Sequence, residues 1–293
     1  MLIDLQLHSI YSDGYLKPEE LARFVANNKV KVAAITDHNT TAGIEPFRAA
    51  CKKYKIKVIN GMEIYCKYKG RKVNILWYNF NKDDECLLKL LKESRCRRAT
   101  SAKKALIKLK RRGFRIDVDN ILSKFDNYIP VNRLSDEITK DRFNYQKIFR
   151  EVKKKNKFAK ILREEDVLSI LFFGDKKNHL NEVYINIERV LKARESAGGQ
   201  LIFCHPGKSN RYAHNMVYKL RDIGIDGVET LSPHHSIGAI MYLQFLSETL
   251  DMIATGGSDF HKFEESEGYK IKSFADWFKV DSKNLRRIEE IIN

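Results

Sequence analysis

The sequence predicts an α/β fold with a mainly parallel sheet that is interrupted once by a helical insertion. Three observations support this prediction. Strand and helix patterns alternate up to residue 81, apolar residues take a helical spacing from Lys82 onward, and the alternation resumes after Gly198-Gly199. A chain of 293 residues can hold one large core domain together with such an insertion.

The first 81 residues have the pattern of a β-α-β-α-β series. Residues 2–8 alternate apolar and polar side chains, which is typical of a half-buried strand. Pro18-Glu19-Glu20 begins a helix, because proline and acidic residues are favoured in the first helical turn. The expected strands are 2–8, 30–35, 56–59 and 73–78, and the expected helices are 18–28 and 43–54.

The middle of the chain has a different pattern. Leu87, Leu88 and Leu91 begin a helical spacing of apolar residues, with basic residues on the other faces. Further helices are expected at about 134–140, 145–154, 163–173 and 180–197. We therefore predict a basic helical insertion domain at 82–197 and a core domain made of residues 1–81 and 198–293.

The last third of the chain returns to alternating strands and helices. Strands are expected at 200–204, 227–230 and 250–254, and helices at 216–223 and 237–249. Polar residues cluster after the expected strands, and parallel α/β folds place their sites at the carboxyl ends of strands. The sequence thus predicts that the chemistry gathers on one rim of the sheet.

Composition favours a folded protein with a polyanionic partner. The formal net charge is +16, and by count about +12 of it falls between residues 82 and 197. Five cysteines, odd in number and without a C-x-x-C pair, suggest neither a disulfide framework nor a cysteine zinc site, and favour reduced thiols in the cytoplasm. We see no export signal and no membrane span, and nothing indicates an obligate protein partner.

Histidine, aspartate and glutamate recur where the expected strands end. In Gly257-Ser258-Asp259-Phe260-His261, the positions of Asp259 and His261 point to the same face if the segment is extended. A capped turn with a surface histidine is an equally good interpretation of this segment alone. If seven such groups came together without a metal, neighbouring carboxylates would repel one another, and each would raise the pKa of the other. The candidate ligands are His8, Asp13, His38, Glu63, His205, Asp259 and His261.

Five segments together resemble the polymerase and histidinol phosphatase (PHP) domain family, in particular its small bacterial phosphoesterase branch. They are Asp4-Leu5-Gln6-Leu7-His8-Ser9 with Ser12-Asp13-Gly14, Ala34-Ile35-Thr36-Asp37-His38-Asn39-Thr40-Thr41, Gly61-Met62-Glu63-Ile64, Cys204-His205-Pro206-Gly207 and Gly257-Ser258-Asp259-Phe260-His261. Their order and spacing agree with the family over nearly the whole chain, although the insertion matches only loosely.

The resemblance implies a distorted seven-stranded, TIM-like β/α barrel that hydrolyses phosphoesters with one to three divalent metal ions. Manganese is the expected ion, with magnesium, zinc and iron as alternatives. By position, His8, Glu63 and Asp259 would serve a first ion and His205, with Glu63 as a bridge, a second. Asp13, His38 and His261 would hold a third. Such ions would clamp the phosphate and ionise the attacking water.

Two positions depart from the family pattern. Gln6 and Asn74 stand where the family usually has histidines, so they are at most weak ligands. A side-chain amide offers a neutral oxygen, which is a poorer donor than imidazole for zinc-like or manganese-like ions. The substitutions are compatible with an altered metal preference, with fewer ions, or with a site that has lost catalysis.

Two further residues are candidate contacts to the substrate phosphate. Arg133 falls where the family has a phosphate-facing arginine, and a guanidinium can bind phosphate bidentately. A surface arginine before a helix is an equally good interpretation. His235 and its neighbour His234 lie in a loop after an expected strand and could reach the same rim, although loop histidines more often have no catalytic part.

The expected function is metal-dependent hydrolysis of phosphate esters of nucleotides or nucleic-acid ends. The substrate would then be a phosphorylated small molecule or a nucleic acid. Two alternatives remain: a PHP-fold protein of weakened catalysis that binds polyanions through its insertion, and a histidinol-phosphate phosphatase.

Overall fold

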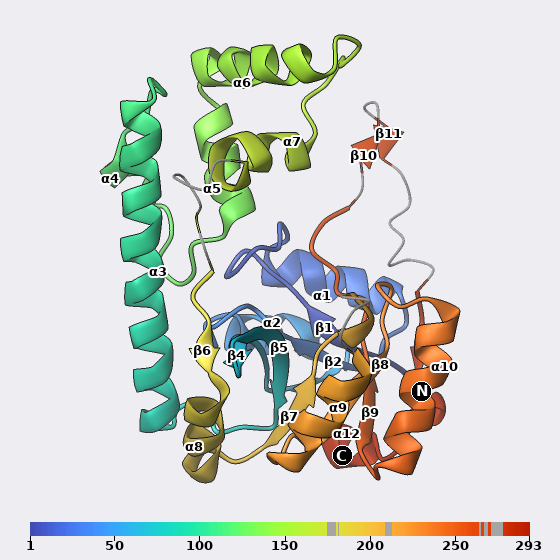
Figure 1. Ribbon diagram of the computed structural model, residues 1–293. Coiled ribbons are helices and arrows are strands. Elements are labelled where there is room, and N and C mark those ends of the chain that lie inside the picture. Colours follow the sequence, from blue (N-terminus) through green and yellow to red (C-terminus); the bar gives the residue numbers. More distant parts are fainter. Residues whose placement is uncertain (175–179, 181, 209–212, 264, 267–268, 271–277) are drawn as a thin grey trace. The chain divides into compact units, whose positions relative to one another are not determined.

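A computed structural model describes residues 1–174, 180, 182–208, 213–263, 265–266, 269–270 and 278–293 (Figure 1). The chain forms two compact units, which we call unit 1 (residues 1–91 and 184–293) and unit 2 (residues 92–183). Each unit has apolar clusters of its own. Among the described residues, no helix is both long enough and apolar enough to cross a lipid bilayer.

One sheet of unit 1 has four strands in the order β12-β1-β2-β3. The strands β1 (Leu2–Leu7), β2 (Val32–Ile35) and β3 (Lys57–Ile59) are parallel, and β12 (Val280–Asp281) runs antiparallel beside β1. The helices α1 (Pro18–Asn27) and α2 (Ile44–Lys52) connect the parallel strands. This half of unit 1 confirms the predicted β-α-β-α-β series.

The second sheet has six strands in the order β6-β4-β5-β7-β8-β9. Its strands are β4 (Gly61–Tyr68), β5 (Arg71–Tyr78), β6 (Ile185–Asn186), β7 (Gln200–Phe203), β8 (Gly227–Leu231) and β9 (Ile253–Gly256). The pairs β7–β8 and β8–β9 are parallel, whereas β5 runs antiparallel to both β4 and β7. The mainly parallel arrangement is therefore interrupted by the β4–β5 hairpin.

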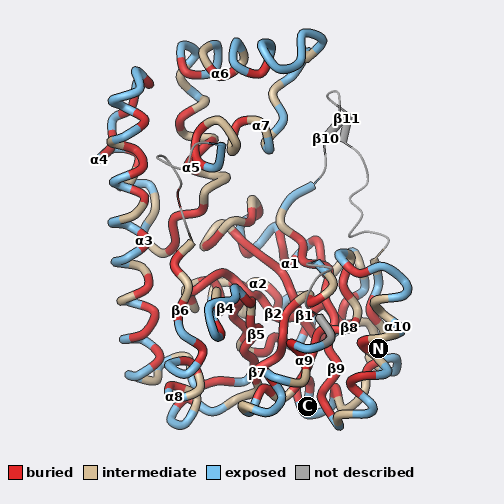
Figure 2. Tube along the Cα trace, viewed as in Figure 1, coloured by how far each residue is buried: buried red, intermediate tan, exposed pale blue. Residues whose placement is uncertain are grey.

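Single bridges connect the two sheets. Leu7 pairs with Phe260, and His38 pairs with Glu63. The helices α8 (Ile187–Ala197), α9 (Ala213–Asp222), α10 (Ile237–Thr249) and α12 (Glu289–Ile292) complete unit 1, together with a short hairpin of β10 (Glu265–Ser266) and β11 (Tyr269–Lys270). Figure 2 shows that the central strands of unit 1 are largely buried.

Two predicted boundaries were wrong, and one strand was not predicted. The helix expected at 180–197 begins only at Ile187, because residues 185–186 extend to pair with β4. The strand expected at 250–254 begins at Ile253, because α10 runs to Thr249 and Asp251 then takes a positive φ of 53° in the turn. Strand β4 was not predicted, since its second half, Tyr65-Cys66-Lys67-Tyr68, mixes polar and apolar residues.

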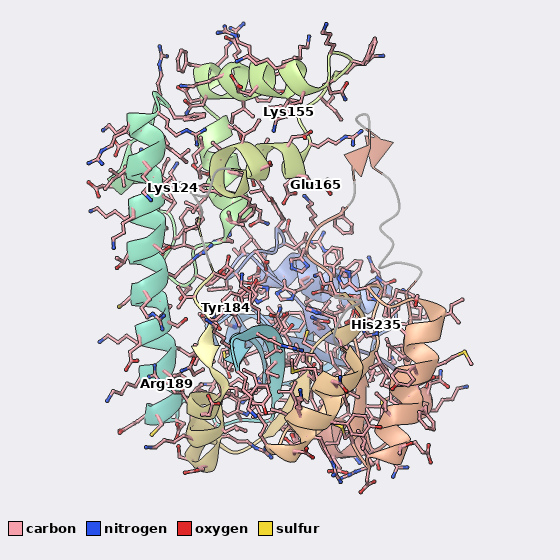
Figure 3. The ribbon with its side chains drawn as sticks, viewed as in Figure 1. Lys124, Lys155, Glu165, Tyr184, Arg189 and His235 are labelled. Carbon is pink, nitrogen blue, oxygen red and sulfur yellow. The ribbon has the colours of Figure 1, made fainter. Side chains whose placement is uncertain are left out.

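Unit 2 consists of helices and turns, without a strand among its described residues. The helix α3 (Glu85–Arg111) begins in unit 1 and continues into unit 2, where α4 (Val118–Leu122), α5 (Val131–Thr139), α6 (Arg142–Lys155) and α7 (Glu164–Leu168) follow, with a π-helical turn at Ser169–Phe173. The predicted helical character of this region is confirmed. Side chains that end in nitrogen project from α3 and α6 (Figure 3).

Candidate metal centre

The seven candidate ligands lie close together in unit 1, although they come from distant parts of the chain. Each is placed by the end of a strand or by a strand itself. They are His8 after β1, Asp13 in the following loop, His38 after β2, Glu63 within β4, His205 after β7, and Asp259 and His261 after β9. The sequence predicts Glu63 just beyond the end of a strand. The structure instead places it within β4.

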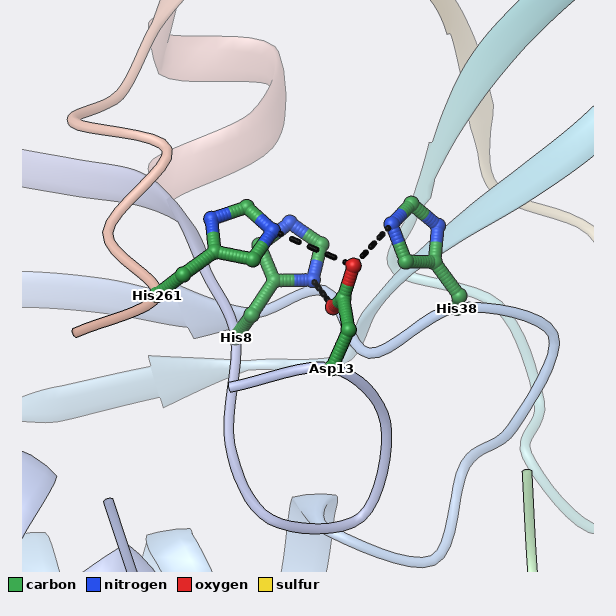
Figure 4. Close-up of side chains that lie close together, drawn as sticks. All are labelled: His8, Asp13, His38 and His261. Atoms are coloured by element: carbon green, nitrogen blue, oxygen red, sulfur yellow. Dashed lines mark ion pairs between the residues drawn. The ribbon is translucent and has the colours of Figure 1, made fainter. Parts of the chain in front are cut away.

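Four of these side chains surround one point, and we call them the imidazole group: His8, Asp13, His38 and His261 (Figure 4). Their ligand atoms lie within 4.8 Å of one another. Oδ2 of Asp13 is 3.3 Å from Nε2 of His38 and 3.4 Å from Nε2 of His261. Oδ1 of Asp13 is 3.4 Å from Nδ1 of His8. Three nitrogen donors and a carboxylate at this spacing can hold a divalent ion.

Two more groups adjoin the imidazole group. The Glu63–Asp259 group contains His8, Glu63 and Asp259, and the thiol group contains Glu63, Cys204 and His205. Nε2 of His8 lies 3.1 Å from Oδ1 of Asp259 and 3.3 Å from Oε2 of Glu63. Oε1 of Glu63 lies 3.4 Å from Nε2 of His205. His8 and Glu63 thus each belong to two groups, so the three groups form one continuous cluster.

The surroundings of His8 test whether the cluster suits a metal. The ring is fully buried, and neither ring nitrogen makes a well-aligned hydrogen bond to the residues that the structure describes. Buried polar atoms almost always have such a partner. Burial lowers the pKa of His8, but Asp259 and Glu63 outweigh it and hold that pKa well above its ordinary value. A divalent ion would supply both the missing partner and the positive charge.

The carboxylates of the cluster are held ionised. Burial raises the pKa of Asp13, but the charges of His38 and His261 outweigh it and hold that pKa well below its usual range. Burial likewise raises the pKa of Glu63, and the charge of His38 with the hydrogen bond from His205 holds it well below its usual range. Both carboxylates are therefore ready to ligate a cation.

Asp37 fixes the loop that follows β1. Its carboxylate accepts the backbone N–H of Ser9 at 2.8 Å, the hydroxyl of Ser9 at 2.7 Å and the hydroxyl of Ser12 at 2.6 Å. Asp37 is 1% exposed, so water competes little for these bonds. The loop that holds Asp13 is thereby tied to the end of β2.

The segment after β9 lies directly against β1. Asp4 accepts the backbone N–H of Ser258 at 2.9 Å. A Cβ atom on Gly257 would lie 2.5 Å from the backbone nitrogen of Gln6, so only glycine permits this approach. Burial raises the pKa of Asp4 to about 6, against the opposing hydrogen bonds from Ser258. Asp4 thus positions the segment that holds Asp259 and His261.

Gln6 and Asn74 both contact Glu63. The Gln6 amide donates to Oε2 of Glu63 at 3.3 Å, and the Asn74 amide donates to Oε1 at 2.6 Å. Oε1 of Gln6 is buried and accepts no hydrogen bond from the described residues. The two departures from the family pattern therefore lie beside the same carboxylate.

His234, the neighbour of His235 in the same loop, contacts the cluster. Its Nε2 lies 2.6 Å from Oδ2 of Asp259. Lys208 lies near the same carboxylate, with Nζ 3.7 Å from Oδ2. His234 follows Pro233 in a loop, and that position was the only sequence signal for it.

The predicted phosphate contact of His235 is not supported by its surroundings. Its Nδ1 lies 2.9 Å from the carbonyl oxygen of Thr230, and its Nε2 accepts the N–H of Gly207 at 3.1 Å. Burial lowers the pKa of this ring, which favours the neutral form. Both nitrogens are thus engaged by the backbone, and His235 holds two loops together instead of facing a ligand.

Two further residues at the cluster, Glu229 and Tyr65, were not predicted from the sequence. Glu229, within β8, accepts the N–H of His205 at 2.8 Å, and burial raises the pKa of its carboxyl group well above its usual value. The Tyr65 hydroxyl lies 3.0 Å from Nε2 of His38, and the two rings stack with centres 4.3 Å apart. A carboxylate in a buried strand was a usable signal for Glu229, whereas Tyr65 offered none.

Arg133 belongs to unit 2. It lies in α5, and its guanidinium carbon is 5.8 Å from the ring centre of Phe125. Its contact with a substrate phosphate stays a prediction.

The chain is similar in sequence to two curated bacterial enzymes. It is 26% identical to a 5'-3' exoribonuclease from Haemophilus influenzae, over 88% of this chain and 89% of that protein. It is 25% identical to a phosphoribosyl 1,2-cyclic phosphate 1,2-diphosphodiesterase from Eggerthella lenta, over 89% of this chain and 94% of that protein.

A solved structure has the same fold. It is a protein of Bifidobacterium adolescentis proposed to be a metal-dependent phosphoesterase, with a TM-score of 0.78 and 19% identity over 99% of this chain and 94% of that one. The likeness confirms the predicted fold class. The family model described as PHP domain matches residues 4–157, more than half of the chain. The chain therefore belongs to the PHP domain family.

Proposed function

We propose that this protein is a metal-dependent phosphoesterase that hydrolyses phosphate esters of nucleotides or of RNA ends. One observation above all supports the proposal: four imidazoles and three carboxylates from six separate segments meet in one buried cluster. Divalent ions bound there would polarise the phosphate and lower the pKa of an attacking water. The names of the relatives, an exoribonuclease and a phosphodiesterase, favour the same chemistry.

The imidazole group is the best candidate for a manganese site. It combines one carboxylate with three imidazoles, which bind metal ions in their neutral form. This donor set suits first-row ions such as Mn²⁺. Asp13 and His261 hold each other in place, with Nε2 of His261 3.4 Å from Oδ2. In our proposal these residues orient the ion that faces the phosphate.

Basic residues at a neighbouring pocket would bind the substrate anion. The pocket lies within unit 1 and is lined by Arg71, Lys72, Asn74, His205 and Lys208, among others. His205 belongs to the cluster, so an anion in the pocket would adjoin it. In our proposal the lysines hold the phosphate, and the partly exposed His234 donates a proton to the leaving oxygen.

Unit 2 by itself has features of a nucleic-acid-binding surface. It contains 25 Lys and Arg against 13 Asp and Glu, a net charge of +12, whereas the whole chain has +16. On α6, Tyr145 and Phe149 stack with ring centres 6.2 Å apart, and Nζ of Lys153 lies 4.9 Å from the centre of the Phe149 ring. Stacked rings flanked by cations are typical of surfaces that bind single strands.

A substrate panel tests the proposal. The purified protein is stripped with a chelator, reloaded with Mn²⁺, and assayed for phosphate release from mononucleotides, bisphosphorylated nucleotides, histidinol phosphate and an aryl phosphate. Degradation of 5'-phosphorylated RNA is measured alongside. We expect no turnover without metal and turnover of at least one nucleotide or RNA substrate with it. Inactivity of the loaded protein on the whole panel would refute the proposal.

The loss of family histidines at Gln6 and Asn74 favours one competing function, a polyanion-binding protein of weakened catalysis. Metal content separates the two. More than one ion per chain after purification without added metal supports the enzyme. Less than one ion per chain, with RNA binding that weakens steeply in salt, supports the binding protein.

A further inference from the structure

We propose that Cys204 is a metal ligand, so that one ion of the cluster is held by a thiolate, an imidazole and a carboxylate. The inference rests on the proposed function only in expecting ions at the cluster. It assigns to the thiol group a chemistry different from that of the imidazole group.

The first argument is the position of the sulfur. The ligand atoms of Glu63, Cys204 and His205 lie within 4.8 Å of one another. Two donors bound to one zinc-like ion at about 2.0–2.3 Å lie at most about 4.5 Å apart, so small side-chain movements would suffice. Cys204 is 1% exposed, so its sulfur is shielded from solvent.

The second argument is the backbone that follows β7. Consecutive residues of a regular strand point to opposite faces. His205 has a φ of 26°, in a region that residues other than glycine rarely adopt, and this breaks the alternation. Cys204 and His205 can therefore both approach Glu63. Such a conformation in a non-glycine residue costs free energy, and strained backbone of this kind is concentrated at functional sites.

The third argument is the identity of the neighbours. Gln6 and Asn74, which replace two imidazoles of the family pattern, both contact Glu63, and the Gln6 amide also lies 3.1 Å from Sγ of Cys204. The thiol thus lies on the side of the cluster where nitrogen donors are missing. A thiolate is a stronger donor to soft or borderline ions than an amide oxygen.

The surroundings of the sulfur also argue for a cation. Its S–H can donate to Oε2 of Glu229 at 3.8 Å, and a carboxylate oxygen of Glu63 lies within 4.8 Å of Sγ. A dication bound by Glu63, Cys204 and His205 would release the thiol proton to solvent.

The assignment predicts a divided metal preference. The imidazole group, with nitrogen and oxygen donors, would accept Mn²⁺. The thiol group would prefer ions that bind sulfur, such as Zn²⁺, Fe²⁺ or Co²⁺. Zinc should then leave Cys204→Ser faster than it leaves the wild type during dialysis, whereas manganese should leave both proteins at the same rate.

Cobalt provides the direct test. In a parent protein whose exposed thiols are replaced, Cys86→Ser with Cys96→Ser, stepwise addition of Co²⁺ to the metal-free protein should produce a near-ultraviolet thiolate-to-cobalt charge-transfer band. Cys204→Ser should remove that band and weaken zinc binding at this position by at least about tenfold, the lower end of what even a supporting residue costs. Cys66→Ser, a buried cysteine on β4 outside the cluster, should leave the band unchanged.

X-ray absorption of the zinc-loaded parent keeps the test valid if Cys204→Ser folds poorly. A sulfur shell at about 2.3 Å supports the assignment. A spectrum with only nitrogen and oxygen neighbours, or a charge-transfer band that persists in Cys204→Ser, overturns it. A sulfur shell in a protein without phosphoesterase activity would refute the proposed function and leave this inference intact.

Discussion

Charged side chains gather in the interior of unit 1, whereas in unit 2 they cover the surface. In unit 1, His8, Glu63 and Asp259 are each less than a tenth exposed and lie within 3.3 Å of a partner. In unit 2, Lys153, Lys154 and Lys155 are exposed on α6. The interior cluster depends on exact positions, while the surface depends on the density of charge. Substitutions in unit 1 should therefore reduce metal binding and turnover, whereas substitutions in unit 2 should change the affinity for RNA.

The largest expected effect comes from the interior cluster. His261→Ala removes one of the four donors of the imidazole group, so Mn²⁺-dependent turnover should fall by more than about 100-fold, because even residues that only support a ligand cost about 10–100-fold. Phosphate release and bound manganese are measured together. RNA affinity of the metal-free protein should not change. A variant that keeps its manganese and its rate would remove His261 from the site.

The next effect comes from the residue that supports the loop of Asp13. Asp37→Asn keeps one acceptor oxygen but loses at least one of three hydrogen bonds to Ser9 and Ser12. We expect turnover to fall by about 10–100-fold, with weaker metal retention. The free energy of unfolding should fall by about 1–3 kcal/mol, as for a buried group left unpaired. Unchanged manganese affinity would show that the loop does not need this anchor.

The surface of unit 2 should respond to charge number. The triple change of Lys153, Lys154 and Lys155 to Gln should reduce the slope of log affinity against log salt by about two for single-stranded RNA, at about 0.7 for each phosphate contact. Turnover of a mononucleotide should stay within about twofold of the wild type. The matched control changes Lys52, Lys53 and Lys55 of unit 1, which are also exposed, to Gln. An equal loss in the control would mean that only net charge matters.

The smallest effect concerns an ion pair of unit 2. Glu137 pairs with Lys124 and Lys140. Burial raises the pKa of Glu137, but the two lysines outweigh it and lower that pKa. A folded-state pKa below the unfolded one stabilises the protein above the ordinary glutamate pKa of about 4.3, and the gain is lost as pH falls through the folded value.

Glu137→Gln should accordingly lower the free energy of unfolding by less than about 1 kcal/mol at neutral pH. The difference from the wild type should shrink below about pH 4. Urea unfolding at several pH values measures both. A loss above about 2 kcal/mol would show that charge in unit 2 also has a structural role.

Much of the cluster was predictable because its residues follow apolar strands. His8 comes directly after β1 and His38 three residues after the end of β2, where strand ends in a parallel sheet meet. Glu63 was predicted as a candidate ligand but assigned to the wrong local structure, since the β4–β5 hairpin turns at Lys69-Gly70, with positive φ at both, inside a polar and basic stretch. Hydrophobic periodicity does not detect such a strand.

The contacts of Cys204, His234 and His235 could not be predicted from the sequence, because they depend on the local backbone conformation. Cys204 would point away from His205 in any regular strand, and only the unusual φ of His205 brings them to one side. His234 and His235 are neighbours in a loop, and the sequence alone could not tell which one faces Asp259 and which one binds the backbone. Loop conformation is set by tertiary contacts, which a single sequence does not reveal.

The contact between β1 and the segment after β9 has a consequence for biosynthesis. The N–H of His8 donates to the carbonyl oxygen of Phe260 at 3.0 Å, and the two residues that hold the ends of the imidazole group, His8 and His261, are 253 positions apart. A ribosome must therefore synthesise the chain from His8 through His261 before the cluster can assemble. Contacts of such sequence separation also form late in folding. Ions should thus enter a finished protein, and a nascent chain should show no metal-dependent gain in protease resistance until residue 261 has left the ribosome.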